Sequence, residues 1–159
     1  MILFHGSNVE VKEPKLLKIQ RTLDFGKGFY TTSDLEQATK WAKRTALRLH
    51  QDYGFVSVYE VEDDELTQLR ILWFDAPDVE WLRFVVNNRS GREVPAGWDI
   101  IAGPVANDQT ASVIDLFLDG MYDEEEAIKR LLPQKLKDQY TFKTKEAIKL
   151  LHCEKVICV

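Results

Sequence analysis

The sequence predicts an α+β domain built on a split antiparallel β-sheet with flanking helices. Predicted strands and helices are mixed along the chain and do not alternate as the regular β-α-β units of a doubly wound sheet. No internal repeat, low-complexity run or linker divides the 159 residues, so residues 1–159 are expected to form a single domain. A chain of this length buries about 70% of the surface that its unfolded form exposes, which allows a core without disulfides or metals.

The first third of the chain predicts a strand and a helix. Residues 2–4 form a short apolar run typical of a strand. Ser33 and Glu36 match a capping box, in which the serine hydroxyl caps a helix and the glutamate reaches back to it. Apolar residues then recur at helical spacing and predict a helix over about 34–50.

The remaining helices and strands are predicted from the helical or alternating spacing of apolar residues and from residues that begin or end helices. Pro77 is expected in the first turn of a helix, where its missing N–H costs nothing. Gly120 is expected to end one helix and Asp123 to cap the next. The predicted strands are 55–61, 69–74, 98–102, 139–144 and 156–159, and the predicted helices are 77–88, 110–119, one from Asp123 to Pro133 and one from Thr144 to Leu151.

Composition and charge exclude several classes of protein. Hydrophobic residues make up 45% and charged residues 30% of the chain, as in globular rather than disordered proteins. A net charge of -5 argues against broad electrostatic capture of nucleic acid or anionic membrane, although it leaves room for a local basic patch. No apolar stretch approaches the roughly 20 residues of a membrane helix, and the N-terminus does not resemble a secretory signal. We therefore expect a cytoplasmic protein that does not bind membranes.

No metal site or disulfide is predicted. Cys153 and Cys158 are five residues apart and would face opposite sides of one regular strand. The three histidines, at positions 5, 50 and 152, are too few and too scattered to suggest a multi-histidine site.

Two N-terminal segments carry residues suited to a flat polar ligand. His5 ends the first predicted strand and can bond a ligand hydroxyl, and Gly6 lets a ligand approach the backbone; a lone histidine there is more commonly structural. The segment 26–32 places two glycines before an aromatic pair, and Phe29 and Tyr30 should face opposite sides, one toward the core and one toward a cleft. The alternative is a glycine turn that leads into a strand with core aromatics.

A third such segment opens with Gln139, whose amide can bond a sugar hydroxyl. The simpler interpretation is a polar residue at the start of a strand. The pattern of Gly26 to Gly28 fails the dinucleotide-binding fingerprint, because a strand follows it rather than a helix.

Together these segments resemble the ADP-ribosyltransferase fold of the histidine–tyrosine class. The pattern over nearly the whole chain is similar in particular to DUF3990, a bacterial family of uncharacterised domains of this type. The resemblance is carried by residues 4–7, 24–32, 59–61, 99–108 and 139–144. It implies an ADP-ribosyltransferase-like split sheet, NAD as co-substrate without a metal, and mono-ADP-ribosylation of a macromolecular acceptor, protein or nucleic acid. Small bacterial relatives are commonly toxins, some with a small antitoxin partner.

The resemblance also implies roles for individual residues. His5 would bond the adenosine-side ribose, the backbone of Gly6 would hold the nicotinamide carboxamide, and Tyr30 would stack on the nicotinamide ring. The hydroxyls of Thr31 and Thr32 lie where the class often holds the nicotinamide. Further residues expected to contact NAD are Gly28, which permits close backbone approach, Asn107, which offers an amide, and Arg21, Lys27 and Arg44, which are candidates for the pyrophosphate or else solvated surface charges.

Gln139 is the main departure from the class, because many relatives carry glutamate at this position. Glutamine keeps a hydrogen bond but loses the charge that stabilises an oxocarbenium-like transition state. Loss of one such charge typically lowers the rate by about 10²–10³-fold. Asp108 is our candidate for a substitute carboxylate, with a helix cap as the alternative role of Asn107 and Asp108. Asp24 is a second candidate, more simply a turn residue. The competing functions are an NAD or ADP-ribose binding module and an interaction protein on the same scaffold.

Overall fold

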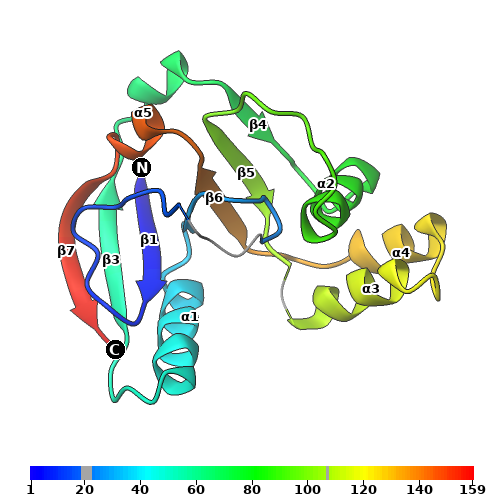
Figure 1. The fold of residues 1–159 in the computed structure, drawn as a ribbon, viewed down its shortest axis with the longest axis horizontal. Helices are drawn as coiled ribbons and strands as arrows, with labels where there is room; N and C mark the ends of the chain where they lie inside the picture. Colours follow the sequence, from blue (N-terminus) through cyan, green and yellow to red (C-terminus); the bar gives the residue numbers. More distant parts are fainter. Residues whose placement is uncertain (19–22, 107) are drawn as a thin grey trace.

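The computed structural model describes residues 1–18, 23–106 and 108–159, with the backbone alone at Asp108 and Gln109. In this part of the chain the strands form two sheets, ordered β1-β3-β7 and β2-β6-β5-β4 (Figure 1). The strands are β1 Ile2–Ser7, β2 Phe29–Thr31, β3 Phe55–Glu60, β4 Ile71–Trp73, β5 Ile100–Pro104, β6 Asp138–Phe142 and β7 His152–Cys158. The helices are α1 Leu35–Arg48, α2 Val79–Arg89, α3 Asp108–Leu118, α4 Glu124–Leu131 and α5 Lys145–Ile148, with a short 3₁₀ helix at Glu65–Gln68.

The predicted α+β class is confirmed, and the predicted antiparallel pairing holds for every ladder of the described residues except one. Strands β4 and β5 pair in parallel, with Ile71 opposite Ile100, whereas the other ladders are antiparallel. Helix α2 connects β4 to β5 and returns the chain to the end from which β4 started, so the two strands run in the same direction.

Helix α1 lies against the sheet β1-β3-β7 (Figure 1). Its buried residues are Ala38, Ala42 and Ala46, which pack near Val56 of β3. Small side chains let helix and sheet approach closely: a Cβ added at Gly6 would lie 2.1 Å from the carbonyl oxygen of Ala38. The glycine in β1 is therefore required by helix packing.

The predicted start of α1 is right, but the predicted cap is wrong. Asp34, not Ser33, is the N-cap, and its carboxylate accepts a hydrogen bond from the Gln37 N–H at 2.7 Å. Glu36 does not complete a capping box; its carboxylate lies 2.7 Å from the Lys40 ammonium. Ser33 is drawn away because its hydroxyl and N–H both bond to Asp138 of β6.

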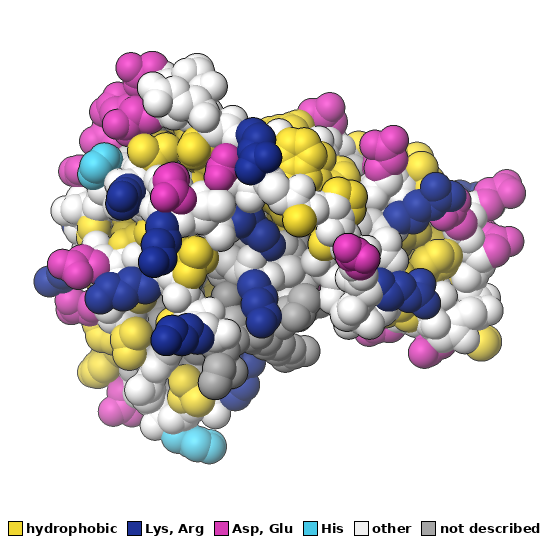
Figure 2. Space-filling view, turned by 45° about the horizontal axis from the view of Figure 1, so that its top comes forward, with side chains coloured by type: hydrophobic (Ala, Val, Ile, Leu, Met, Phe, Trp, Pro, Cys, Tyr) yellow, Lys and Arg dark blue, Asp and Glu magenta, His cyan; other side chains and the backbone are white. Residues whose placement is uncertain are grey.

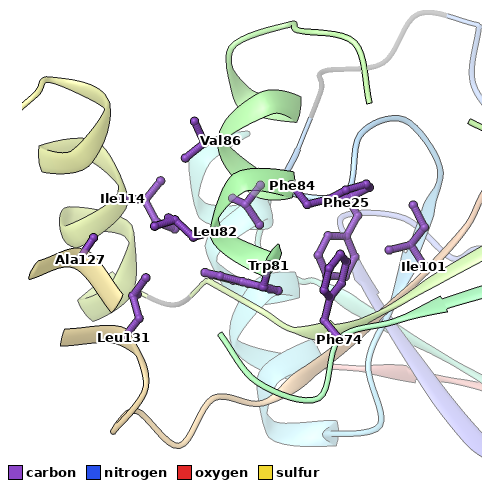
Figure 3. Packing of buried hydrophobic residues seen from close by; sticks show 11 residues of the cluster. Phe25, Phe74, Trp81, Leu82, Phe84, Val86, Ile101, Ile114, Ala127 and Leu131 are labelled. Carbon is purple, nitrogen blue, oxygen red and sulfur yellow. The ribbon is translucent and has the colours of Figure 1, made fainter. Parts of the chain in front are cut away.

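Two apolar clusters flank the sheet β2-β6-β5-β4. One lies between the sheets and joins Leu3 and Tyr59 to Phe29, Ile100 and Phe142. The other packs helices α2, α3 and α4 on the opposite face; Figure 3 shows its members, which include Phe25, Phe74, Trp81, Leu82, Ile101, Ile114 and Leu131. Because the sides of β2 alternate, Phe29 belongs to the first cluster and Tyr30 packs on the second.

The other cap predictions are mostly confirmed. Asp123 caps α4 by accepting the Glu126 N–H at 2.8 Å, and Gly120 follows α3 with a φ of 74°. Thr144 caps α5, but this helix ends at Ile148, and β7 begins earlier than predicted, at His152. Pro77 lies one residue before the α2 cap, Asp78, and not in the first helical turn.

Candidate functional site

Strands β1 and β2 meet at the border between the two sheets. Phe4 and Thr32 exchange two backbone hydrogen bonds, of 2.8 and 3.0 Å, and beyond this pair the strands belong to different sheets. In antiparallel register Gly6 then stands opposite Tyr30. Backbone groups of alternate residues point to the same edge of a strand, so the N–H and C=O of Gly6 face β2, as those of Phe4 do. We call residues 4–6 and 30–32 the β1–β2 junction.

His5 bridges this junction with its imidazole. Nδ1 lies 2.7 Å from the backbone carbonyl oxygen of Tyr30. A carbonyl oxygen only accepts, so Nδ1 carries the proton and Nε2 is left as an acceptor in the neutral ring. Burial lowers the pKa of His5 below its usual value of 6.5, against the opposing effect of the bond to Tyr30. The ring also stacks on Phe29, with centroids 4.3 Å apart, which fixes its plane.

The Tyr30 phenol is oriented by the segment that precedes β2. Its hydroxyl donates to the Gly26 carbonyl at 2.6 Å and accepts from the Phe25 N–H at 3.1 Å. The Lys143 ammonium in turn donates to the Phe25 carbonyl at 2.6 Å. Burial, and the nearby charge of Asp24, raise the pKa of Tyr30, so the phenol is neutral. These bonds occupy the hydroxyl and set the direction of the ring.

The face of the sheet that carries Tyr30 also carries two polar residues of β6. Thr141 is the register partner of Tyr30, and Gln139 lies two residues along β6 on the same face. Gln139 is buried, and its Nε2 is 3.5 Å from the carbonyl oxygen of Pro104, which also accepts the Trp81 indole N–H at 2.9 Å. The Thr141 hydroxyl is buried and forms no hydrogen bond of ordinary geometry among the described residues, but it lies close enough to the Tyr30 hydroxyl to lower the pKa of that phenol. Polar groups of β6 therefore lie beside Tyr30 on this face.

Asp138 fastens the start of β6 to the turn that follows β2. Its carboxylate accepts from the Thr32 hydroxyl at 3.1 Å, from the Ser33 N–H at 2.8 Å and from the Ser33 hydroxyl at 2.5 Å. The Thr31 hydroxyl donates to the Tyr140 carbonyl at 3.2 Å. Both threonine hydroxyls that the sequence suggested for ligand binding thus hold β2 against β6, and Asp138 positions Gln139. Nothing in the sequence pattern singled out Asp138, because its partners are 105 and 106 residues away.

A family model described as a protein of unknown function, DUF3990, matches residues 1–153. The chain belongs to the DUF3990 family. Comparisons with curated proteins and with solved structures find no match. Membership in DUF3990 confirms the family resemblance seen in the sequence, and it leaves the ADP-ribosyltransferase fold and the use of NAD as predictions.

The other residues that the sequence predicts for the site lie outside the β1–β2 junction or outside the described residues. Lys27 is exposed, and Arg44 lies on the exposed side of α1. Asp108 is the first residue of α3, so the prediction that its carboxylate substitutes for glutamate stays a prediction. Asn107 and Arg21 lie outside the described residues.

Gly28 has a packing role that the sequence did not reveal. A Cβ at this position would lie 2.5 Å from Thr141 Cγ2 and 2.8 Å from the Phe142 carbonyl oxygen. Glycine lets the segment before β2 lie directly on β6, next to the residues that face Tyr30.

Two cavities lie among the described residues, and of the residues of the β1–β2 junction only Phe4 lines one of them. One of about 280 Å³ is lined mainly by α2, β4 and the 94–98 segment, and another of about 410 Å³ lies on the sheet β1-β3-β7 beside Leu35. His5, Tyr30 and Gln139 line neither. Among the described residues of the DUF3990 chain there is no group of three metal-ligating side chains and no helix with the length and apolar character of a membrane span.

Proposed function

We propose that this DUF3990 chain is an NAD-dependent mono-ADP-ribosyltransferase and that NAD binds at the β1–β2 junction. The observation that carries the proposal is the bond from His5 Nδ1 to the Tyr30 carbonyl. It holds an imidazole whose Nε2 can accept a hydrogen bond beside the backbone edge of Gly6 and next to the strand that carries Tyr30. Histidine, glycine and tyrosine, far apart in sequence, thereby meet at one border between two sheets.

The polar groups at the junction suit the parts of NAD. A carboxamide has one acceptor and two donors, and it complements a backbone N–H and C=O that point to the same edge, as those of Gly6 do. The Nε2 of the neutral His5 accepts a hydrogen bond from a ribose hydroxyl. The ring of Tyr30, which lies on the face of β2 opposite Phe29 and His5, would stack on the pyridinium. The Thr141 hydroxyl and the Gln139 amide would supply further hydrogen bonds on the face that carries Tyr30.

The proposed reaction breaks the bond between nicotinamide N1 and the ribose C1′. The bonding electron pair leaves with nicotinamide, which becomes neutral, and a nucleophile of the acceptor bonds C1′ and releases its proton. The chain's residues bind and orient the ribose so that C1′ meets one nucleophile. Gln139 hydrogen-bonds the ribose without supplying charge, so we expect slower chemistry than with a carboxylate, by about 10²–10³.

A second candidate is a binding module for NAD or ADP-ribose. It is favoured by the state of the carboxylates near the junction: Asp24 is paired with Arg89 at 2.8 Å, and Asp138 is bonded by Ser33. Neither is free to replace the charge that Gln139 lacks. An interaction protein on this scaffold, as half of a toxin–antitoxin pair, would use the same family fold without requiring the junction.

Incubation of the purified chain with NAD separates these functions. Nicotinamide release is followed by liquid chromatography, and NAD binding by calorimetry. The variant Tyr30→Leu removes the ring face, and Tyr53→Leu, at an exposed position, is the matched control. If the chain is the proposed enzyme, it should release nicotinamide, Tyr30→Leu should abolish this release and Tyr53→Leu should retain it. Thermal melting checks that both variants fold. Binding without release supports the module, and neither binding nor release contradicts both.

A further inference from the structure

Positive charge is concentrated in the first third of this acidic chain. Residues 1–50 contain nine Lys and Arg and five Asp and Glu, a net charge of +4, whereas residues 51–159 contain 12 and 21, a net charge of -9. On the face drawn in Figure 2, acidic side chains gather at the upper left, basic side chains are spread over the left half and the middle, and both kinds lie together at the right. The surface of the protein is therefore not uniformly acidic, and a partner can bind where positive charge is concentrated.

Helix α1 carries part of this positive charge on its outward side. Each residue of an α-helix is rotated by about 100° around the helix axis, so residues four apart differ by only about 40° in direction. Lys40, Arg44 and Arg48 are spaced in this way, and Trp41 lies within about 100° of Lys40, so all four share one side of the helix. All four are exposed, whereas the alanines of the opposite side pack on the sheet. We call Lys40, Trp41, Arg44 and Arg48 the α1 stripe.

Trp41 is the unusual member of the stripe. Its exposed fraction is 47%, and it belongs to none of the three buried clusters of the described residues. An indole that stabilises a core would be covered, and the core side of α1 is already filled by alanine. A large flat ring among three cations is instead typical of surfaces that stack on the bases of single-stranded nucleic acid.

The stripe begins beside the candidate site. Gln37 lies about one turn before Lys40 and Trp41 on the same side of α1, and its Nε2 donates to the Asp138 carbonyl at 3.1 Å. The next residue along β6 is Gln139. From Gln37 to Arg48 the helix rises about 16 Å. A strand bound along the stripe would thus run toward the start of β6, where Gln139 follows Asp138.

We propose that the α1 stripe binds single-stranded nucleic acid and, building on the function proposed above, that this nucleic acid is the acceptor of ADP-ribose. Lys40, Arg44 and Arg48 neutralise phosphates, and Trp41 stacks on a base. The exposed pair of Lys40 with Glu36, 2.7 Å apart, is a weak competitor for phosphate. An acidic peptide would use the cations but would leave the indole without a partner, which favours the nucleic acid.

The test measures binding in the absence of NAD. A fluorescein-labelled, unstructured 12-nucleotide RNA, the same sequence as DNA, and a 12-residue polyglutamate peptide are titrated with the full chain, and fluorescence anisotropy is recorded at several salt concentrations. We expect Kd for the oligonucleotides to rise about fivefold or more in Trp41→Ala, since one base stack is lost. In Arg44→Gln with Arg48→Gln, the slope of log K against log[salt] should become shallower by about 1.4.

The matched controls are Lys145→Gln and Lys149→Gln, which remove exposed cations near α5 and should leave Kd within twofold. The proposal is overturned if the oligonucleotides do not bind, if the stripe variants bind like the wild type, or if polyglutamate binds as tightly. A preference for RNA over DNA would indicate contacts to the 2′-hydroxyl. Stripe-dependent binding without nicotinamide release would retain the surface and reject only its role as an acceptor site.

Discussion

His5 and Tyr30 are joined across the border of two sheets by a 2.7 Å contact between the imidazole Nδ1 and the backbone carbonyl oxygen. The bond fixes the tautomer of the imidazole and leaves Nε2 as the nitrogen that can accept a hydrogen bond. Because Phe29 stacks on the same ring, the direction of Nε2 is set by the packed interior and not by a mobile side chain.

The first prediction concerns this acceptor nitrogen. In His5→Leu the side chain keeps a similar volume but loses both nitrogens, and we expect NAD to bind about 3–10-fold more weakly, the value of one net hydrogen bond. Isothermal titration calorimetry measures the change. His50→Leu, at an exposed position after α1, is the control and should bind NAD as the wild type does. Equal affinity of all three proteins would remove His5 from the site.

NAD affinity should also depend on pH through His5. Burial lowers the pKa of its imidazole below 6.5, so the ring is neutral at pH 7 and Nε2 accepts. As the pH falls through this lowered pKa, protonation turns Nε2 into a donor and affinity should decline. Titrations from pH 7.5 to 4.5 should therefore show weaker binding only at the acidic end. A decline centred above pH 6.5 would contradict the assignment to His5.

Gln139→Glu tests the charge that this chain lacks. If the junction performs the proposed transfer, the carboxylate should raise the rate of nicotinamide release by about 10²-fold. Gln139→Leu, which retains neither the charge nor the hydrogen bonds, should release less nicotinamide than the wild type. An unchanged rate in Gln139→Glu, with NAD still bound, would show that the ribose does not lie beside this residue.

Because Lys143 is partly buried, we predict that the free energy of unfolding rises with pH. Burial lowers the pKa of its ammonium to about 8, against about 10.4 in an unfolded chain. Between these values the unfolded state binds more protons, so the free energy of unfolding should increase as pH rises from 8 toward 10. Urea unfolding at pH 7.5 and 9.5 measures this. Lys143→Met should remove the rise and exposed Lys149→Met should keep it; a rise that survives in Lys143→Met would assign it elsewhere.

Gly6→Ala should destabilise the fold regardless of any ligand. Its Cβ would lie 2.1 Å from the Ala38 carbonyl oxygen, so α1 must move from the sheet. We expect a loss of about 2 kcal/mol or more in the free energy of unfolding. Gly91→Ala is the comparison, since no atom lies within 4 Å and only its φ of 66° opposes the substitution, by about 1 kcal/mol. A smaller loss at Gly6 than at Gly91 would contradict the close packing of α1.

Local signals in the sequence predict much of the fold. The alanine and leucine spacing gave the helix α1, the β-branched run gave β3, and Asp123 and Thr144 cap the helices that follow them. The cap of α1 was misassigned because Ser33 is drawn away by Asp138, a partner 105 residues later. The parallel pairing of β4 with β5 likewise depends on where α2 packs, which no local pattern encodes.

The candidate site divides in the same way. Residue types and spacing drew attention to His5, Tyr30 and Gln139, and the structure brings His5 to the backbone of Tyr30 and sets Gln139 on the face of Tyr30. The groups that orient them, Lys143 and Asp138, act through contacts between distant strands and carry no motif. Close packing also explains why glycine stands at positions 6 and 28, which the sequence predicts to contact a ligand.

The most direct test of the account is whether NAD reaches the imidazole of His5. In a chain labelled with ¹⁵N-histidine, NAD is titrated while the imidazole resonances of His5, His50 and His152 are recorded by NMR. We predict a saturable shift of the His5 Nε2 resonance, with little change at the exposed His50 and His152. NAD binding that leaves the His5 resonance unmoved, or no binding at millimolar NAD, would contradict the account.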